Sequence, residues 1–172
     1  ARVLDYCAGG GGKTLALAGR ARARIFAHDI NPARMADLQT RVNRAGADVR
    51  VLATAEAEKQ APFDLVLCDV PCSGSGAWRR APGAKWALTP EKLDALLQLQ
   101  AEILDRAMTL VSPGGTLAYV TCSLLNTENQ DQIDRFLANQ PEYGLQHSLF
   151  LTPLDGGDGF FLALLTRAKI KL

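Results

Sequence analysis

Residues 63–76 read FDLVLCDVPCSGSG, an apolar run that passes directly into a loop of Pro, Cys, Ser and Gly residues. The run at 63–69 is almost continuously apolar, which is typical of a strand buried on both faces of a parallel sheet. Parallel strands need long crossover connections, usually helices. The stretch therefore predicts an α/β fold with polar chemistry gathered where this strand ends.

Strand-like and helix-like segments alternate through the rest of the chain. We predict further strands at residues 2–7, 23–29, 49–54 and 116–122. We predict helices at residues 13–22, 32–45, 89–111 and 126–139. Residues 144–149 and 160–167 are expected to form an antiparallel hairpin. This order predicts a doubly wound, mostly parallel α/β sheet with an antiparallel C-terminal hairpin, and a single domain over residues 1–172.

Composition limits the possible functions less than these sequence patterns do. The 172 residues are 48% apolar and 22% charged, as in a soluble globular protein, and the net charge of +1 confines any nucleic-acid contact to a local patch. The four cysteines, at 7, 68, 72 and 122, lack the spacing of a disulfide framework or zinc site. We expect free thiols in a reducing cytoplasm and no metal. No run approaches the roughly 18 apolar residues of a membrane span, so we expect no membrane partner.

A second loop of small residues, CAGGGGK at 7–13, follows the first predicted strand. It ends like a phosphate-binding loop, but that motif requires glycine where Cys7 stands, and the G-x-G-x-x-G spacing of dinucleotide sites is also incomplete. The next strand ends at Asp29, 17 residues after Gly12, where a carboxylate can accept hydrogen bonds from ribose hydroxyls. Loop and acid together favour a nucleoside cofactor without a pyrophosphate, and S-adenosylmethionine is the candidate.

Two cysteines follow predicted strands directly. Cys72 lies in the loop after Asp69, and Cys122 ends the strand at 116–122. Each thiol alone is compatible with an inert core residue. Because both lie at the carboxyl ends of strands, we expect Cys72, Cys122 and Asp69 to converge on one pocket, which suggests covalent chemistry on a small planar electrophile.

Several motifs then match one family. They are LDYCAGGGGKTLALA at 4–18, AHDINPARM at 27–35, FDLVLCDVPCSGSGAWRRAPGAKW at 63–86, GGTLAYVTCSLLNTENQ at 114–130 and DGFFLALLTR at 158–167. Together they resemble the RNA (cytosine-5) methyltransferases, most of all the nucleolar-protein/Sun branch that contains the bacterial Sun and Fmu proteins. The resemblance implies a Rossmann-like methyltransferase sheet, S-adenosylmethionine as cofactor, and methyl transfer to C5 of cytosine in RNA, usually ribosomal RNA.

The resemblance also implies roles for site residues. Cys122 is the nucleophile that adds to C6 of the base, Cys72 helps to eliminate it, and Asp69 hydrogen-bonds or protonates the cytosine edge at N3. Cytosine-5 methyltransferases that act on DNA use a Pro-Cys cysteine instead, and Cys72 would have that part. The residues expected around the cofactor are Cys7, Ala8, Gly9, Gly10, Gly11, Gly12, Lys13, Asp29 and Asp69. Lys13 is expected to pair with the cofactor carboxylate or with a nearby acid.

A stacked cytosine hides C5 and C6, so the RNA partner must present a single-stranded or flipped-out base. The stretch WRRAPGAKW at 78–86 interleaves aromatic and cationic residues and is a candidate RNA contact, with packing on the long helix as the alternative. Members of the family carry an additional N-terminal RNA-binding region, which we expect to be missing from residues 1–172. A DNA or protein methyltransferase and a catalytically silent RNA-binding module remain alternatives, and the oligomeric state is open.

Overall fold

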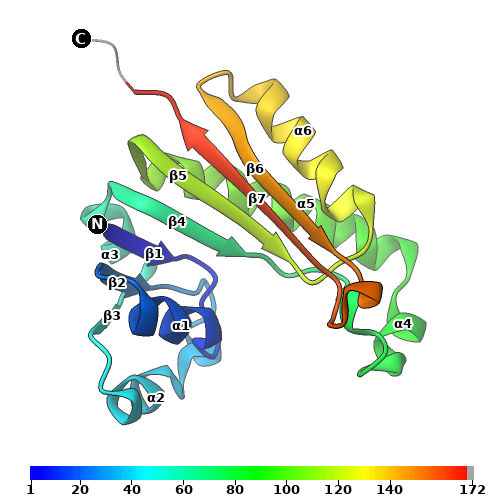
Figure 1. Cartoon of the computed structure of the whole chain (residues 1–172), viewed down its shortest axis with the longest axis horizontal. Helices are drawn as coiled ribbons and strands as arrows, with labels where there is room; N and C mark the ends of the chain where they lie inside the picture. The colour runs from blue at the N-terminus through cyan, green and yellow to red at the C-terminus, as the bar shows by residue number, and fades with distance from the viewer. Residues whose placement is uncertain (170–172) are drawn as a thin grey trace.

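The computed structural model describes residues 1–169 and arranges them around a seven-stranded sheet of order β3-β2-β1-β4-β5-β7-β6 (Figure 1). The strands are β1 (Arg2–Asp5), β2 (Arg24–Ala27), β3 (Val49–Val51), β4 (Phe63–Asp69), β5 (Val111–Thr121), β6 (Tyr143–Leu151) and β7 (Phe160–Arg167). The first five are parallel, and β7 runs antiparallel to both β5 and β6. The predicted α/β sheet with an antiparallel C-terminal hairpin is confirmed.

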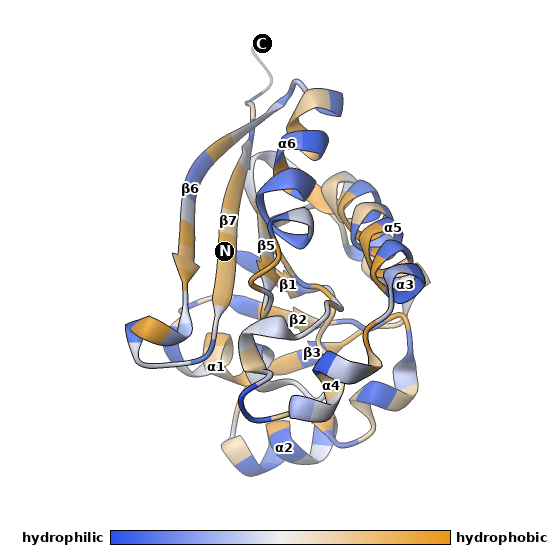
Figure 2. Cartoon of the chain, turned by 90° about the vertical axis from the view of Figure 1, so that its right-hand side faces the viewer, coloured by the Kyte–Doolittle hydropathy of each residue, from blue (hydrophilic) through white to orange (hydrophobic). Residues whose placement is uncertain are grey.

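Helices cover both faces of the sheet. They are α1 (Gly12–Arg20), α2 (Leu38–Ala45), α3 (Thr54–Gln60), α4 (Pro82–Ala87), α5 (Pro90–Ala107) and α6 (Gln130–Asn139). Helices α5 and α6 lie on one side of the sheet (Figure 2), where Leu104 and Phe136 join a buried cluster with Val66 of β4. On the other side, Leu38 and Val42 of α2 pack in a second buried cluster. Within residues 1–169, no helix combines the length and apolar character needed to cross a bilayer.

Strand β4 lies in the middle of the sheet and matches its predicted bounds, 63–69. It pairs with β1 through Leu65, Val66 and Leu67, and with β5 along nearly its whole length. Neighbours on both edges and helices on both faces explain why its sequence is apolar without alternation.

All four predicted helices have different bounds in the structure. Residues 13–22 correspond to α1, and residues 126–139 divide into a 3-10 turn at Asn126–Glu128 and α6. The helix expected at 32–45 is divided, because a 3-10 turn at Pro32–Met35 precedes α2. The side chain of Asn31 accepts a hydrogen bond from the Ala33 N–H at 3.1 Å and fixes this tight turn. The helix expected to reach residue 111 ends at Ala107, and after one further 3-10 turn Val111 begins β5.

The Ser-Pro-Gly-Gly segment at 112–115 was expected to lie between helix and strand, but it lies inside β5. Phe63 pairs with Val111, and the next register pair is Leu65 with Thr116, so the intervening residues of β5 form a bulge. Gly114 has φ +79°, which suits such an irregularity. Helices α3 and α4 were not predicted, since both are short.

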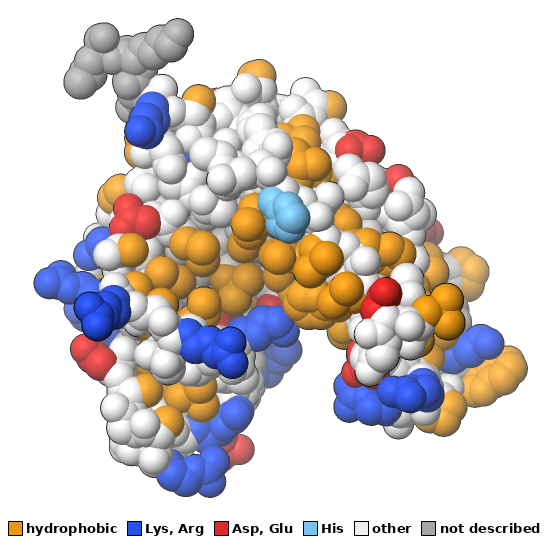
Figure 3. Space-filling model, in the orientation of Figure 1, with side chains coloured by type: hydrophobic (Ala, Val, Ile, Leu, Met, Phe, Trp, Pro, Cys, Tyr) orange, Lys and Arg blue, Asp and Glu red, His pale blue; other side chains and the backbone are white. Residues whose placement is uncertain are grey.

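Apolar side chains spread over part of the sheet face that is turned to the viewer in Figure 1 (Figure 3). Leu67 of β4 and Val120 of β5 form a small buried cluster, against which the partly buried Leu164 of β7 packs, and Leu149 of β6 is 40% exposed. The described helices on this side, α1 and α2, lie over the opposite half of the sheet (Figure 1).

Close backbone contact at Gly76 generates a stability prediction. Its N–H donates to the Cys122 carbonyl and its own carbonyl accepts from the Gly159 N–H, both at 2.9 Å. A Cβ at position 76 would collide with the Gly159 backbone. Gly76→Ala should therefore lower the free energy of unfolding by about 1–3 kcal/mol in urea titrations followed by circular dichroism.

The matched control is Gly83→Ala in α4, where an added Cβ has nothing within 4 Å. Alanine is also the better helix former, so this variant should be as stable as the parent chain or more so. Equal unfolding midpoints for the two variants would contradict the close approach at Gly76.

Candidate active site

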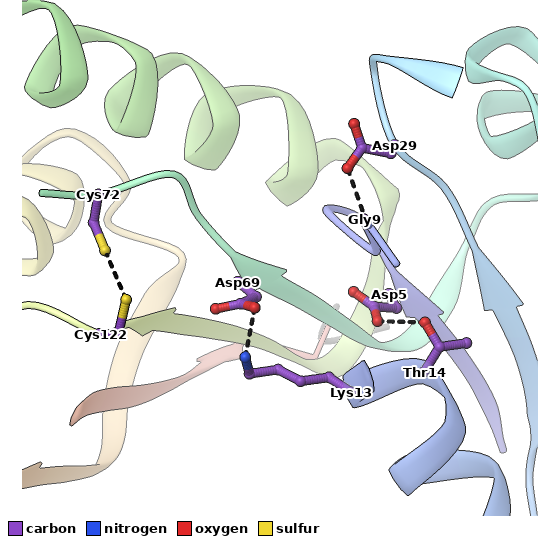
Figure 4. Close-up of polar contacts among 8 residues, drawn as sticks. All are labelled: Asp5, Gly9, Lys13, Thr14, Asp29, Asp69, Cys72 and Cys122. Atoms are coloured by element: carbon purple, nitrogen blue, oxygen red, sulfur yellow. Dashed lines mark hydrogen bonds and ion pairs between the residues drawn. The ribbon is translucent and has the colours of Figure 1, made fainter. Parts of the chain in front are cut away.

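The carboxyl ends of four parallel strands form the edge on which the candidate residues lie (Figure 4). Asp5 ends β1, Asp29 follows β2, Asp69 ends β4 and Cys122 follows β5. The surface is hollowed between the part that carries α1 and α2 and the part that carries α4 (Figure 3). Ligands of open α/β sheets bind at this edge.

Strand register brings Cys72 and Cys122 together. Asp69 pairs with Val120, so Cys122 lies two residues beyond this pair on β5 and Cys72 three residues beyond it on the neighbouring segment. The two Sγ atoms are 3.4 Å apart, within hydrogen-bond distance. The structure thus places the two sulfurs in one site, as the sequence predicted.

The two thiols differ in ionisation. The hydrogen bond from Cys72 lowers the pKa of Cys122 to about 7 against the opposing effect of partial burial. The same bond, together with burial, raises the pKa of Cys72 well above its ordinary value. Cys122 is also the more exposed of the pair. Of the two thiols, Cys122 is therefore the one that ionises more readily near neutral pH.

The other two cysteines are chemically quiet. Burial raises the pKa of Cys7 to about 12 and raises that of the fully buried Cys68 well above its usual value. Cys68 belongs to the buried core cluster, whereas the partly buried Cys7 packs against it and lines a pocket next to Asp29. Among residues 1–169, no three His, Cys, Asp or Glu side chains gather as a metal-binding group would.

Asp69 and Lys13 form an ion pair on the same sheet edge as the cysteines (Figure 4). The Lys13 Nζ lies 2.5 Å from Asp69 Oδ2, and both side chains are about one-third exposed, at 38% and 34%. The Lys13 ammonium also lies 5.8 Å from the centre of the Phe160 ring. Lys13 was expected to pair with the cofactor carboxylate or with a nearby acid, and in the structure it pairs with the acid Asp69.

The glycine-rich loop predicted at 7–13 ends at Gly11, because α1 begins at Gly12, and it turns back toward β2. The Ala8 N–H donates to the His28 carbonyl at 2.9 Å. Gly11, with φ +78°, ends the loop directly before α1, and a Cβ there would collide with the Leu38 side chain. Glycine at this position is thus required both by backbone conformation and by space.

Asp29 is 3% exposed and is held from several sides. Its Oδ2 accepts from the Gly9 N–H at 3.0 Å, and its Oδ1 accepts from the Asn31 N–H at 2.9 Å. Arg34 Nη1 approaches Oδ2 at 3.3 Å. The carboxylate is therefore fixed beside the glycine loop.

A pocket opens between Asp29 and helix α5. Tyr6, His28 and Asp29 line it on the sheet side, and Leu99, Ile103 and Arg106 line it on the helix side. The His28 ring stacks on Tyr6 at 4.6 Å, and its Nε2 contacts the Thr54 hydroxyl at 2.9 Å. A flat-sided pocket with an acid at its rim has the chemistry of a nucleoside site.

Sequence reasoning missed Asp5, which is 1% exposed. Its Oδ2 accepts from the Thr14 hydroxyl at 2.7 Å, while its Oδ1 is buried without a hydrogen-bond partner. Burial raises the pKa of this carboxyl to about 6. The signal in the sequence was an acid at a strand end two residues before the glycine loop.

Some side chains of the aromatic and cationic stretch at 78–86 are packed against the protein, and others are exposed to solvent. Trp78 is half-buried, and its Nε1 donates to the Ser73 carbonyl at 3.3 Å. Trp86 is 81% exposed, with the Lys85 ammonium 5.5 Å from its ring. Arg80 pairs with Asp158 in the loop between β6 and β7.

Comparison with known proteins gives a consistent result. A family model described as 16S rRNA methyltransferase RsmB/F matches residues 1–166. The ribosomal RNA small subunit methyltransferase B of Salmonella agona (strain SL483) is 39% identical over 181 residues, covering 96% of this chain and 42% of the relative. The chain thus spans less than half the length of the curated relatives it matches.

Solved structures agree on the fold. The crystal structure of PH0851 has a TM-score of 0.86 and 35% identity, covering 95% of this chain and 42% of that one. NSun6 from Pyrococcus horikoshii with SFG has a TM-score of 0.85 and 22% identity, covering 98% of this chain and 49% of that one. At this lower identity, the likeness to NSun6 shows the fold.

The sulfur contact generates a prediction about thiol reactivity. In the parent chain, the rate of Cys122 alkylation by iodoacetamide should rise with pH through a midpoint of about 7. Cys72→Ala removes the hydrogen bond to the thiolate, so the midpoint should rise toward the ordinary value of about 8.5. Mass spectrometry of the Cys122 peptide across a pH series measures this.

Cys7→Ala is the control, because it leaves the sulfur pair intact and should keep the midpoint of the parent chain. A Cys72→Ala midpoint that stays near 7 would show that the sulfur contact is not what lowers the Cys122 pKa.

Proposed function

This chain belongs to the 16S rRNA methyltransferase RsmB/F family, and we propose that it transfers a methyl group from S-adenosylmethionine to C5 of a cytosine in small-subunit ribosomal RNA. The observation that carries the proposal is the 3.4 Å contact between the sulfurs of Cys72 and Cys122. It lies beside the Lys13–Asp69 ion pair and on the same sheet edge as a nucleoside-like pocket. A thiolate beside a charged pair and a cofactor pocket has the chemistry required to activate a pyrimidine covalently.

The cofactor site fits S-adenosylmethionine. Asp29 would accept hydrogen bonds from the ribose hydroxyls, and the pocket between Tyr6 and Ile103 has flat apolar walls for the adenine. The buried Oδ1 of Asp5, which has no partner, is an acceptor suited to the cofactor ammonium. When bound, this cofactor supplies an electrophilic methyl group on a sulfonium. The backbone of the loop at 7–13 would follow the methionine and sugar parts.

The first step of the proposed reaction is addition of the Cys122 thiolate to C6 of cytosine. As the S–C6 bond forms, the C5=C6 electron pair moves toward C5 and N3. The Lys13–Asp69 pair would face the N3 edge of the base, where Asp69 would hydrogen-bond or protonate N3 and the Lys13 ammonium would balance the developing negative charge. C5 would then accept the methyl group that bound S-adenosylmethionine supplies, with the S–CH₃ electron pair left on the sulfur of that molecule.

The second step removes the C5 proton and releases the enzyme. The bond to Cys122 is the largest cause that raises the pKa of Cys72. Once the Cys122 sulfur is a thioether on C6, it is a weak acceptor, and Cys72 would ionise more readily by giving its proton to water. Cys72 can then take the C5 proton, after which the C5–H electron pair reforms C5=C6 and expels the Cys122 thiolate.

RNA would approach across the hollow surface between α1 and α4 (Figure 3). We propose that a flipped-out or single-stranded cytosine enters it, because C5 and C6 are hidden in a stacked pair. Trp86 and Lys85 on α4 present an exposed ring and a cation suited to stacking and phosphate contact.

A methyltransferase for DNA or protein is the alternative on the same sheet. Incubation of the chain with labelled S-adenosylmethionine and a panel of ribosomal RNA, DNA and protein substrates distinguishes them. Label at cytosine C5 of small-subunit RNA supports the proposal. Transfer to DNA or protein alone, or cofactor binding with no transfer to any member of the panel, contradicts it.

Adduct trapping assigns the two cysteines. On RNA that contains 5-fluorocytosine, C5 carries no removable proton, so the covalent complex should accumulate in the parent chain. Cys122→Ala should form no complex, whereas Cys72→Ala should still form one, because its thiol acts after the adduct. Denaturing gels with labelled RNA measure both. The reverse pattern would assign the nucleophile to Cys72.

Cofactor binding tests Asp29. Asp29→Asn keeps the size of the side chain but loses the charge that strengthens hydrogen bonds to the ribose. Loss of such bonds costs about 1.5–3 kcal/mol, so the dissociation constant for S-adenosylmethionine should rise on the order of ten- to a hundredfold in isothermal titration calorimetry. Asp48→Asn, on an exposed residue before β3, is the control. Unchanged affinity in Asp29→Asn would remove Asp29 from the cofactor site.

A further inference from the structure

A buried carboxylate lies behind the two cysteine loops. Glu128 is 0% exposed and ends a short 3-10 turn, Asn126–Glu128, that follows β5. Its Oε1 accepts from the Ser73 N–H at 2.8 Å and from Gln100 Nε2 at 3.0 Å. Its Oε2 accepts from the Ser73 hydroxyl at 2.5 Å and from the Ser123 hydroxyl. The buried charge is thus compensated by four donors.

The donors come from the residues next to the catalytic sulfurs. Ser73 follows Cys72 directly, and Ser123 follows Cys122 directly. Gln100, which also binds Glu128, donates to the carbonyl of Pro71, the residue before Cys72. One carboxylate is therefore bonded to both loops, and its partner amide holds the first loop from the other end.

The turn that carries Glu128 is itself fixed. The Tyr119 hydroxyl donates to the Glu128 carbonyl at 2.6 Å, and the side chain of Asn129 bonds to Thr121 at 2.6 Å and to the Ser123 carbonyl at 2.9 Å. Tyr119 and Thr121 belong to β5 and are fully buried. The Glu128 carboxylate is thus fixed to the sheet independently of the two cysteine loops.

We propose that Glu128 is a positioning residue, which holds the loops of Cys72 and Cys122 at the separation that keeps their sulfurs in contact. The role in catalysis rests on the proposed function, because a shared site for the two thiols matters when one adds to C6 and the other removes the C5 proton. The contact between the two sulfurs involves only side chains of this chain. It is therefore testable on the chain alone.

Two substitutions of Glu128 separate geometry from charge. Glu128→Gln keeps one oxygen for the Ser73 N–H and Gln100, while its new amide group can donate to the serine hydroxyls, which rotate to accept. Glu128→Ala removes every bond between the two loops through this side chain. If position is what matters, Gln should substitute for Glu and Ala should not.

The test is the pH dependence of Cys122 alkylation by iodoacetamide, measured by mass spectrometry without RNA or cofactor. The parent chain and Glu128→Gln should both have a midpoint of about 7. In Glu128→Ala the sulfurs separate, and the midpoint should rise by about one pH unit or more toward that of an ordinary thiol. Gln132→Leu is the matched control, because Gln132 is buried and bonds Gln100 but neither cysteine loop.

A folded Glu128→Ala with the midpoint of the parent chain would overturn the proposal. The proposal would also be overturned if the alkylation midpoint of Gln132→Leu rose as much as that of Glu128→Ala. Loss of any buried polar side chain in this region would then raise the Cys122 pKa. Where circular dichroism shows that Glu128→Ala is unfolded, the Ser73→Ala/Ser123→Ala double variant replaces it, with the same expected rise and the same overturning result. Absence of methyl transfer in the parent chain rejects the proposed function and leaves this readout unchanged.

Discussion

Parallel pairing of β4 with β5 determines where the two cysteine loops begin, because Asp69 lies opposite Val120 in the register. A shift of one residue would turn Asp69 to the other face of the sheet and separate it from the cysteines. The register is held by the buried side chains of both strands, such as Val66 and Leu117, which are 0% exposed. Apolar packing between β4 and β5 thus determines where Asp69 and the two cysteine loops lie relative to one another.

Acidic side chains lie along the carboxyl edge of the sheet, and two of them pair with basic side chains. Asp29 is met by Arg34 and Asp69 by Lys13, whereas Asp5 keeps one oxygen without a partner. An acid-rich edge of this kind suits a cationic ligand, and the burial of Asp5 raises its pKa to about 6, so a bound cation would favour its ionised form. The acidic sheet edge and the apolar pocket beside Asp29 both favour a cationic nucleoside ligand.

The sequence was most informative where a local pattern and burial coincide. The continuous apolar run of β4 and the loops that follow parallel strands could be located because period and strand ends are local properties. The bulge at 112–115 could not, because it depends on how Phe63 pairs with Val111 across the sheet. Glu128 was missed for a similar reason: it lies in a polar run, LLNTENQ, and is buried by donors from segments more than 25 residues away, Ser73 and Gln100. The role of each site residue remains a proposal, while their convergence at the sheet edge is a property of the fold.

The hydrogen bond between the sulfurs links this geometry to chemistry. It lowers the pKa of Cys122 and raises that of Cys72, so one contact gives two identical side chains different parts. In the proposed reaction, addition of the Cys122 thiolate to the base would remove this acceptor, and Cys72 could then lose its proton and act as the base of the second step. Such an exchange works only while the loops stay in place, since a sulfur hydrogen bond weakens quickly with distance. A buried carboxylate bonded to Ser73 and Ser123 supplies that rigidity from outside the reacting surface.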